Sequence, residues 1–160
     1  MMFRTAFAIS LTVAAGGAVR PPLYHIKLEA QNNWTAGSGA ADLLAAPSPF
    51  DVTLTPDGHV LYDITVSTVG LPSPGSAGAT HYVAWVATAD LTDAQLIGVL
   101  DANGKASGRV SFNKFIVVVS AEPGPPGKHW VGPIVMSGFS PSTYLENYSG
   151  RELYNGGTPQ

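Results

Sequence analysis

The chain has 160 residues, of which 45% are hydrophobic and 12% are charged, and its formal net charge is −3. The hydrophobic share suits a chain that folds around a core, and the lack of a basic excess argues against nucleic acid as a partner. Cysteine is absent, which excludes disulfides, thiolate metal sites and cysteine nucleophiles. The 18 glycines and 13 prolines interrupt long helices, so the composition predicts an all-β fold.

Residues 1–18 have the pattern of an export signal. One early positive charge, Arg4, precedes a run of small and apolar residues, and Gly16 and Ala18 supply the small residues that cleavage requires. Cleavage after Ala18 would leave Val19 as the first residue of the mature chain. The alternatives are a retained N-terminal anchor and a first buried strand, since the apolar run is short for a membrane span. We expect a periplasmic or extracellular protein with no transmembrane span in the mature chain.

Short alternating segments separated by turn signals follow from residue 23 onward. The turn sequences Pro56-Asp57-Gly58 and Asp101-Ala102-Asn103-Gly104 each predict a hairpin between the strands beside them. The polar, glycine-rich stretch 31–41 is expected to be a loop, whereas the apolar run from Phe115 is expected to be covered on both faces. The predicted strands are Leu23–Ala30, Phe50–Thr55, His59–Val69, His81–Thr88, Gln95–Leu100, Ala106–Phe112, Phe115–Ala121 and Val131–Ser137.

This series of strands predicts a Greek-key, immunoglobulin-like β-sandwich of about 7–8 strands, with a small barrel as the alternative. We assign the sandwich domain to residues 19–138 and an aromatic-rich tail to residues 139–160. The dipeptide Ser140-Pro141 is a helix start, because serine caps and proline fits the first helical position. The tail is therefore expected to hold one short helix over residues 141–149.

Five segments follow one another in the second half of the chain: a tryptophan strand, a glycine strand, an Asn-Gly turn, a strand ending in Glu-Pro-Gly and a Gly-Pro strand. They are residues 82–86, 96–100, 102–106, 117–124 and 132–138. In this order they resemble the extracytoplasmic C-terminal domain of bacterial anti-sigma-K factors, over residues 80–138. The resemblance implies an immunoglobulin-like sandwich with a binding or sensing role and no enzymatic activity. Those proteins carry a cytoplasmic zinc-binding domain and a transmembrane helix that this sequence does not show, so their sigma-factor function is not implied.

The aromatic residues outside the strands are candidates for partner contacts. Trp85 lies in the middle of a predicted strand and is expected in the core, but two other tryptophans lie in predicted loops. Large, rigid, amphipathic side chains in loops are typical of contact surfaces. We therefore expect a protein partner, with an oligomer also possible, or alternatively a tail that folds back on its own sandwich. The predicted partner-binding residues are Trp34, Trp130, Phe139, Tyr144, Tyr148 and Tyr154.

The histidines are the basis of the alternative function, a periplasmic copper- or zinc-binding protein. Without cysteine, a blue-copper site is excluded, but a weaker site of two histidines and one methionine remains possible. No two histidines have a spacing that would bring them together by local structure, so the leading expectation is that no cofactor is bound. The candidate metal ligands are His25, His59, His81, His129 and Met136.

Glu122 ends the most apolar predicted strand, where an isolated carboxylate must find hydrogen-bond donors. We expect it to accept N–H groups of the following loop. A hydrolase with Glu122 or Asp90 as base is a third hypothesis, and Asp90, Asp93 and Asp101 do not have the spacing of a calcium-binding loop. No nucleophile elbow is present. With no catalytic residue assigned, the leading interpretation is a non-enzymatic, exported interaction or accessory module that binds a protein through loop and tail aromatics.

Overall fold

The computed structural model describes residues 22–31, 34, 37–48, 53–143 and 145. The predicted export signal, residues 1–18, lies outside the described residues, and so do Tyr144, Tyr148 and Tyr154. In the described part of the chain, no helix has the length and apolar character needed to cross a membrane.

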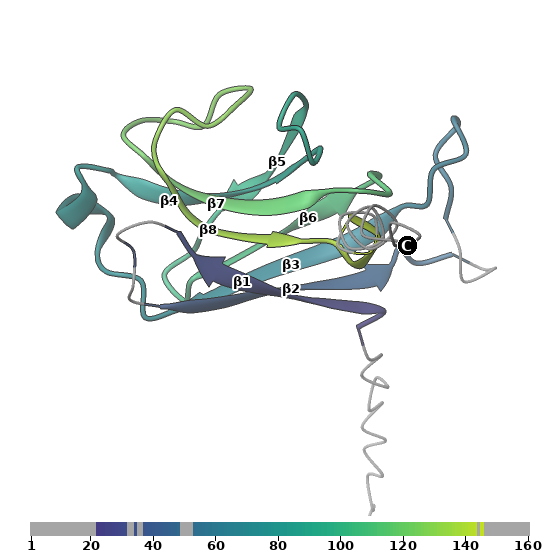
Figure 1. The fold of residues 1–160 in the computed structure, drawn as a ribbon, viewed down its shortest axis with the longest axis horizontal. Helices are drawn as coiled ribbons and strands as arrows, with labels where there is room; N and C mark the ends of the chain where they lie inside the picture. Colours follow the sequence, from purple (N-terminus) through teal and green to yellow (C-terminus); the bar gives the residue numbers. More distant parts are fainter. Residues whose placement is uncertain (1–21, 32–33, 35–36, 49–52, 144, 146–160) are drawn as a thin grey trace, which may run out of the picture.

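Eight antiparallel strands form a nearly closed sheet with little helix, which confirms the prediction of an all-β fold (Figure 1). Across the sheet their order is β5-β4-β7-β8-β1-β2-β3-β6, so β5 and β6 are the two edges. The strands are β1 (Tyr24–Ala30), β2 (Ser38–Ala45), β3 (Tyr62–Val69), β4 (His81–Ala87), β5 (Ala94–Val99), β6 (Lys105–Val110), β7 (Ile116–Glu122) and β8 (Ile134–Phe139), and a short 3-10 helix, η1 (Pro74–Ala77), lies between β3 and β4.

The main core lies between two halves of this sheet, β1-β2-β3-β6 and β5-β4-β7-β8. Successive side chains of a strand point to opposite faces, so every second residue of each strand enters the core. Leu28 of β1, Val66 of β3 and Val119 of β7 are examples, and all three are buried. Only two residue pairs, Glu29 with Ser137 and Ala30 with Met136, join β1 to β8 and so connect the halves on that side. As predicted, β7 is buried along its whole length, which requires cover on both faces.

Strand β2 was not predicted, because its residues fall partly in the stretch expected to be a loop. The segment is rich in alanine and glycine, which have low β-propensity. It forms a strand because Ala41 and Leu43 alternate into the core, where both are buried. Its small residues also permit a close approach, since a Cβ at Gly39 would lie 3.2 Å from the Leu28 side chain.

Both predicted turns form, but only the first joins the segments that we predicted to pair. In the Pro56-Asp57-Gly58 hairpin, Leu54 bridges Val60, and the Thr55 N–H donates to the His59 carbonyl at 2.8 Å, whereas residues 50–52 lie outside the described residues. The Asn-Gly turn closes with the Gly104 N–H donating to the Asp101 carbonyl at 2.9 Å. However, β6 pairs with β3 and β5 pairs with β4, so this turn carries the chain from one edge of the sheet to the other. A local turn signal does not determine which strand supplies the long-range partner.

The C-terminal boundary also differs from the prediction. Phe139, which we assigned to the tail, is the last residue of β8, and residues 131–133 precede that strand. The described part of the predicted helix, residues 141–143 and 145, is helical. It is attached to the sheet because the Thr143 hydroxyl donates to the Phe115 carbonyl at 3.3 Å.

Candidate functional site

The outer face of the half β5-β4-β7-β8 is almost entirely apolar. The strand register aligns its side chains in three rows, because residues paired across neighbouring strands point to the same side. From β5 to β8 the rows are Val99, Val83, Ser120 and Ile134; then Leu96, Trp85, Val118 and Ser137; then Ala94, Ala87, Ile116 and Phe139. We call these twelve residues the apolar face. Ten of the twelve residues in these rows are hydrophobic, so the half has apolar side chains on both of its sides.

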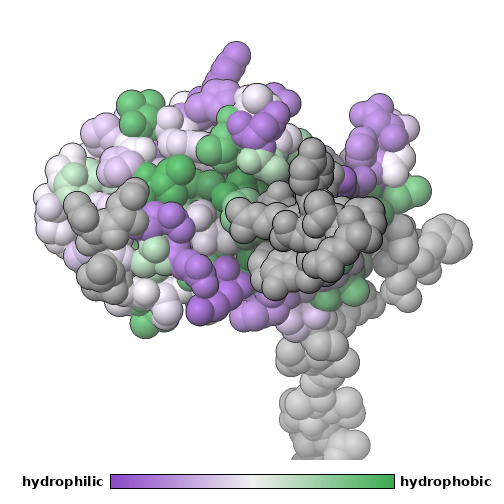
Figure 2. Space-filling view, in the orientation of Figure 1, coloured by the Kyte–Doolittle hydropathy of each residue, from purple (hydrophilic) through white to green (hydrophobic). Residues whose placement is uncertain are grey.

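The outer face of the other half has the opposite character. One of its rows runs from His25 through Asp42 and Thr65 to Ser107, and the next pairs Asp63 with Arg109. These side chains bond to one another: His25 Nδ1 lies 2.6 Å from Asp42 Oδ1, and Arg109 Nε donates to Asp63 Oδ1 at 2.8 Å. In Figure 2, mostly purple and white surface follows β1 and β2, whereas green surface gathers over β4, β7 and β8. A polar face is what an antiparallel sheet normally presents to water, so the apolar face is the exception.

The centre of the apolar face is covered by residues 123–133, which we call the capping segment. Trp85 is completely buried there, and its ring meets Trp130 of the capping segment edge-on at a centroid distance of 6.2 Å. The covered residues form a second hydrophobic cluster, separate from the main core: Val83, Trp85, Ala87, Ile116 and Val118. Trp130 is half-buried and packs on this cluster, so the predicted contact residue is held on the body of the sheet.

A buried carboxylate fixes the capping segment. The Trp85 indole N–H donates to Ser120 Oγ at 2.9 Å, and the Ser120 hydroxyl donates to Glu122 Oε1 at 2.5 Å. Glu122 also accepts the backbone N–H groups of Val131, at 3.1 Å, and Gly132, at 3.3 Å. This confirms the expectation that Glu122 binds loop amides. Charge-assisted bonds to a carboxylate are stronger than neutral ones, so the segment is held firmly at this point.

Apolar side chains remain exposed around the capping segment. Val131 is 82% exposed although its own amide is bound by Glu122. Leu96 and Val99, on the outer side of β5, are also exposed, as is Phe139 at the other margin of the apolar face. Leu91, in the loop between β4 and β5, is exposed as well. The result is a covered centre with an exposed apolar margin.

The structure brings two of the predicted partner-binding residues onto this side and separates a third. Trp130 and Phe139 belong to the capping segment and to the apolar face. Trp34 instead meets Tyr82 edge-on at 6.3 Å and packs against the main core. Tyr82 points inward and donates its hydroxyl to the Pro72 carbonyl at 3.0 Å, and burial raises the pKa of this phenol. Trp34 therefore belongs to a different region from Trp130.

Sequence reasoning missed Val131, Leu96 and Val99. Val131 was included in a predicted strand, where its side chain would have been expected to pack on a neighbour. The available signal was on β5, where Leu96, Ile97 and Val99 place apolar side chains on both faces of a strand. An edge strand with two apolar faces needs cover from elsewhere, and that indicates an unusual outer face.

The five candidate metal ligands occupy different environments. His25 contacts Asp42, His59 lies beside Asn113, and His81 Nδ1 contacts Thr80 Oγ1 at 2.7 Å. His129 packs against Trp130, and Met136 is buried in the main core. Within the described ranges, no three His, Cys, Asp or Glu side chains gather in a way that would hold a metal ion.

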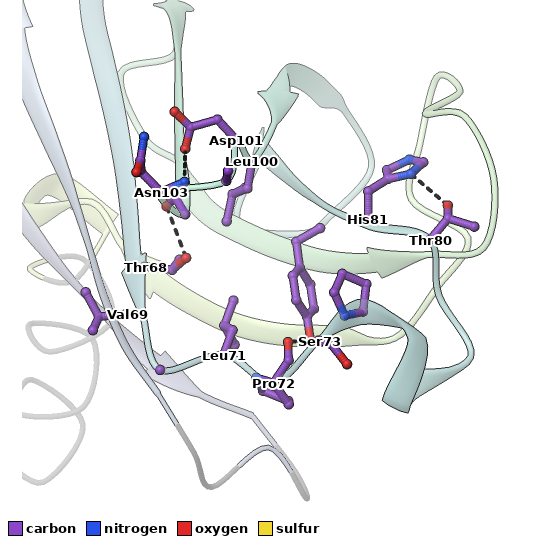
Figure 3. A pocket seen from close by; sticks show the side chains of 15 residues that line it. Thr68, Val69, Leu71, Pro72, Ser73, Thr80, His81, Leu100, Asp101 and Asn103 are labelled. Carbon is purple, nitrogen blue, oxygen red and sulfur yellow. Dashed lines mark hydrogen bonds between the residues drawn. The ribbon is translucent and has the colours of Figure 1, made fainter.

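An open pocket of about 580 Å³ lies at one end of the sheet, between the segment after β3 and the turn between β5 and β6 (Figure 3). Its walls include Thr68, Leu71 and Leu100, with Asp101 and Asn103 at the turn. The polar groups at the turn are engaged in the fold: Thr68 Oγ1 donates to the Gly104 carbonyl, and Asp101 Oδ1 accepts the Asn103 and Lys105 amides. His81 also lines the pocket, and its Nε2 is buried and has no hydrogen-bond partner among the described residues.

The Asp101 carboxylate is expected to make stability at this turn depend on pH. Its pKa is held below the usual value, first by the bond from the Lys105 backbone N–H. A carboxyl with a lower pKa in the folded state stabilises the fold above its unfolded pKa, and this contribution is lost as the pH falls through the folded pKa. We expect Asp101→Asn to have a lower urea midpoint than the parent protein at pH 6. The difference between the two midpoints should shrink as the pH is lowered through the folded-state pKa of Asp101, and a difference that does not change with pH would contradict this.

No protein-family model matches the chain, no curated protein is similar to it, and no solved structure matches its fold. The resemblance to anti-sigma-K domains therefore stays a prediction, and the apolar face with its capping segment is the best-defined candidate site in the described residues.

Proposed function

We propose that this protein is a non-enzymatic interaction module that binds a protein partner through the apolar face and its capping segment. The observation that carries the proposal is Val131, which is 82% exposed while a buried carboxylate holds its amide. An apolar side chain that is both exposed and rigidly held loses little conformational freedom when a partner covers it. Trp130, the residue before Val131, is of the type that most often anchors protein interfaces.

The surroundings of Val131 support the same reading. Trp130 precedes it in the chain, and Leu96 and Val99 extend the apolar margin along β5. Exposed apolar residues scattered singly need no explanation, but a group on one face is typical of an interaction surface. The polar outer face of the other half provides an internal comparison, because it is built from ion pairs and hydroxyl contacts in the same molecule.

We further infer that the strands form a Greek-key, immunoglobulin-like sandwich and that the protein works outside the cytoplasm. Support for the sandwich comes from the strand partners: β3 pairs with β6 and β4 pairs with β7, so two pairs of non-consecutive strands interlock. Such crossovers between two packed layers are typical of Greek-key sandwiches. Support for export comes from residues 1–18, with their early charge and small, apolar run.

The proposal can be tested with a variant that places charges on the exposed margin. We expect Leu96→Asp combined with Val131→Asp to abolish partner binding, because a charge must be desolvated when the margin is covered. The tagged parent protein would be cross-linked in an extract of the cells it comes from and recovered through its tag. The proteins retained with it, including untagged copies of this chain, would then be quantified. The amount of a protein that the parent captures should be at least about tenfold lower with the double variant. This corresponds to a loss of about 1.4 kcal/mol of binding free energy.

Val69→Asp is the matched control, since Val69 is 72% exposed at the end of β3, on the other half of the sheet. It should retain the same protein as the parent. If parent, double variant and control retain the same proteins in the same amounts, the apolar face is not the binding surface.

A further inference from the structure

We propose that the partner on the apolar face is a second copy of this chain, packed face to face with its strands antiparallel to those of the first. This inference rests on the proposed function, because it names the partner of the same surface. Two observations carry it: the two loops that flank the face have opposite charges, and those loops lie at opposite ends of the strands.

The loop positions follow from the strand pairing. Ala87 at the end of β4 pairs with Ile116 at the start of β7, and His81 at the start of β4 pairs with Glu122 at the end of β7. The loop 88–93 therefore leaves one end of the face and the capping segment leaves the other. Both loops rise above the sheet on the same side, so a partner on the face would meet both (Figure 1).

The charges on the two loops are complementary. Asp90 and Asp93 are exposed in the loop 88–93, and Lys128 is exposed in the capping segment beside His129. Lys114, just before β7, lies at the same end as the two aspartates. At the other end, the Glu122 carboxylate is buried and bonded to Ser120 and to the Val131 and Gly132 amides, which leaves Lys128 as the exposed charge of the capping segment. Asp90, Asp93 and Lys128 form no ion pair with any described residue, so their charges are available to another molecule.

The negative charge of the loop 88–93 is secured by its own hydrogen bonds. Asp90 Oδ1 accepts the Thr92 hydroxyl at 2.9 Å and the Thr92 N–H at 3.3 Å. Bonds to Thr88 and Thr92 lower the pKa of this carboxyl, so it is ionised at neutral pH.

A two-fold axis that lies in the interface plane, perpendicular to the strands, uses this arrangement twice. The rotation reverses the strand direction, so the loop 88–93 of each copy meets the capping segment of the other. A parallel arrangement would instead place Asp90 and Asp93 of one copy against the same residues of the other, and like charges repel. The antiparallel pair thus gives two equivalent attractive contacts between the loops, beside the exposed apolar margin.

The size of the face requires the loops to take part. Four strands about 4.8 Å apart and three residue rows give a projected area of roughly 400 Å². A stable protein interface takes about 800 Å² from each partner. Because the capping segment already covers the centre of the face, the contact area must come from the outer surface of that segment, the loop 88–93 and the margin residues Leu96, Val99 and Val131.

The test is the association state of the purified full chain, measured by sedimentation equilibrium at low and high salt. We expect a dimer that weakens as salt rises, because exposed ion pairs are screened. Asp93→Lys and Lys128→Glu should each weaken the dimer by at least about tenfold, since symmetry repeats each change. Mixed one to one, the two variants should form a heterodimer of nearly parental stability, because each altered loop then meets an oppositely charged loop.

Asp57→Lys is the matched charge reversal outside the face, in the exposed turn before β3, and should leave the dimer unchanged. A chain that stays monomeric at about 0.5 mM overturns the second copy as partner, whereas the proposed function stands if capture from extract still depends on Leu96 and Val131. A dimer that responds to Val131→Asp but not to the charge reversals overturns the antiparallel arrangement. If none of the changes on the face alters either the dimer or the capture from extract, both the second copy as partner and the proposed function are overturned.

Discussion

Gly132→Ala is expected to lower the free energy of unfolding by at least about 3 kcal/mol. A Cβ at this position would lie 1.7 Å from the Ala121 carbonyl oxygen and 2.7 Å from its carbon, and both are backbone atoms of β7. The capping segment would have to move away from the sheet, which breaks the bonds from Val131 and Gly132 to the buried Glu122. Urea unfolding followed by tryptophan fluorescence would measure the loss, because Trp85 and Trp130 are in contact.

Gly124→Ala is the control in the same segment. A Cβ at Gly124 has no neighbour within 4 Å, so this change should stay within about 0.5 kcal/mol of the parent protein. Equal stabilities of the two alanine variants would show that the capping segment does not lie against β7 as described.

Glu122→Ala is expected to cost about 3–4 kcal/mol, because it leaves the Ser120 hydroxyl and two backbone N–H groups without their acceptor in a buried place. Glu122→Gln keeps an oxygen acceptor of the same shape and should cost less, about 1–2 kcal/mol. The ordering of the two variants tests whether hydrogen-bond acceptance, as opposed to volume, is what this side chain contributes. Denaturant midpoints at pH 7, converted with a common slope, give both values.

Glu29→Ala removes a comparable carboxylate from the exposed surface of β1, where Lys27 Nζ lies 3.7 Å away. Exposed ion pairs contribute little, so this variant should lie within about 0.5 kcal/mol of the parent. If Glu122→Ala is no worse than Glu29→Ala, the buried network does not hold the capping segment.

The strands with regular alternation could be predicted from the sequence, because period two is a local signal. This is why β1, β4 and β7 were placed correctly, and why Trp85 could be assigned to the core. Strand β2 could not be predicted, since alanine and glycine have low β-propensity. Its small residues are explained by the close contact with Leu28 and Met136, which only the folded structure shows. The partners of β5 and β6 could not either, because pairing between distant strands depends on how the whole sheet closes.

The candidate site shows the same division. Glu122 could be found from its place at the end of an apolar run, since a carboxylate there needs donors wherever the loop goes. The apolar face could not be found from the sequence, because it depends on the register of four strands. That register places Leu96 beside Trp85 and Phe139 beside Ile116. The exposure of Val131 depends on the path of the capping segment, which Gly132 permits only through a close backbone contact.

The two edge strands of the sheet lie against one another, and this affects how the protein can aggregate. Gln95 of β5 donates its side-chain amide to the Arg109 carbonyl of β6, and a Cβ at Gly108 would lie 3.1 Å from the Ile97 carbonyl oxygen. Free strand edges are the usual templates for adding a foreign strand and for fibril growth. Because β5 and β6 shield each other, this fold is expected to resist edge-to-edge polymerisation, although one of its outer surfaces is apolar.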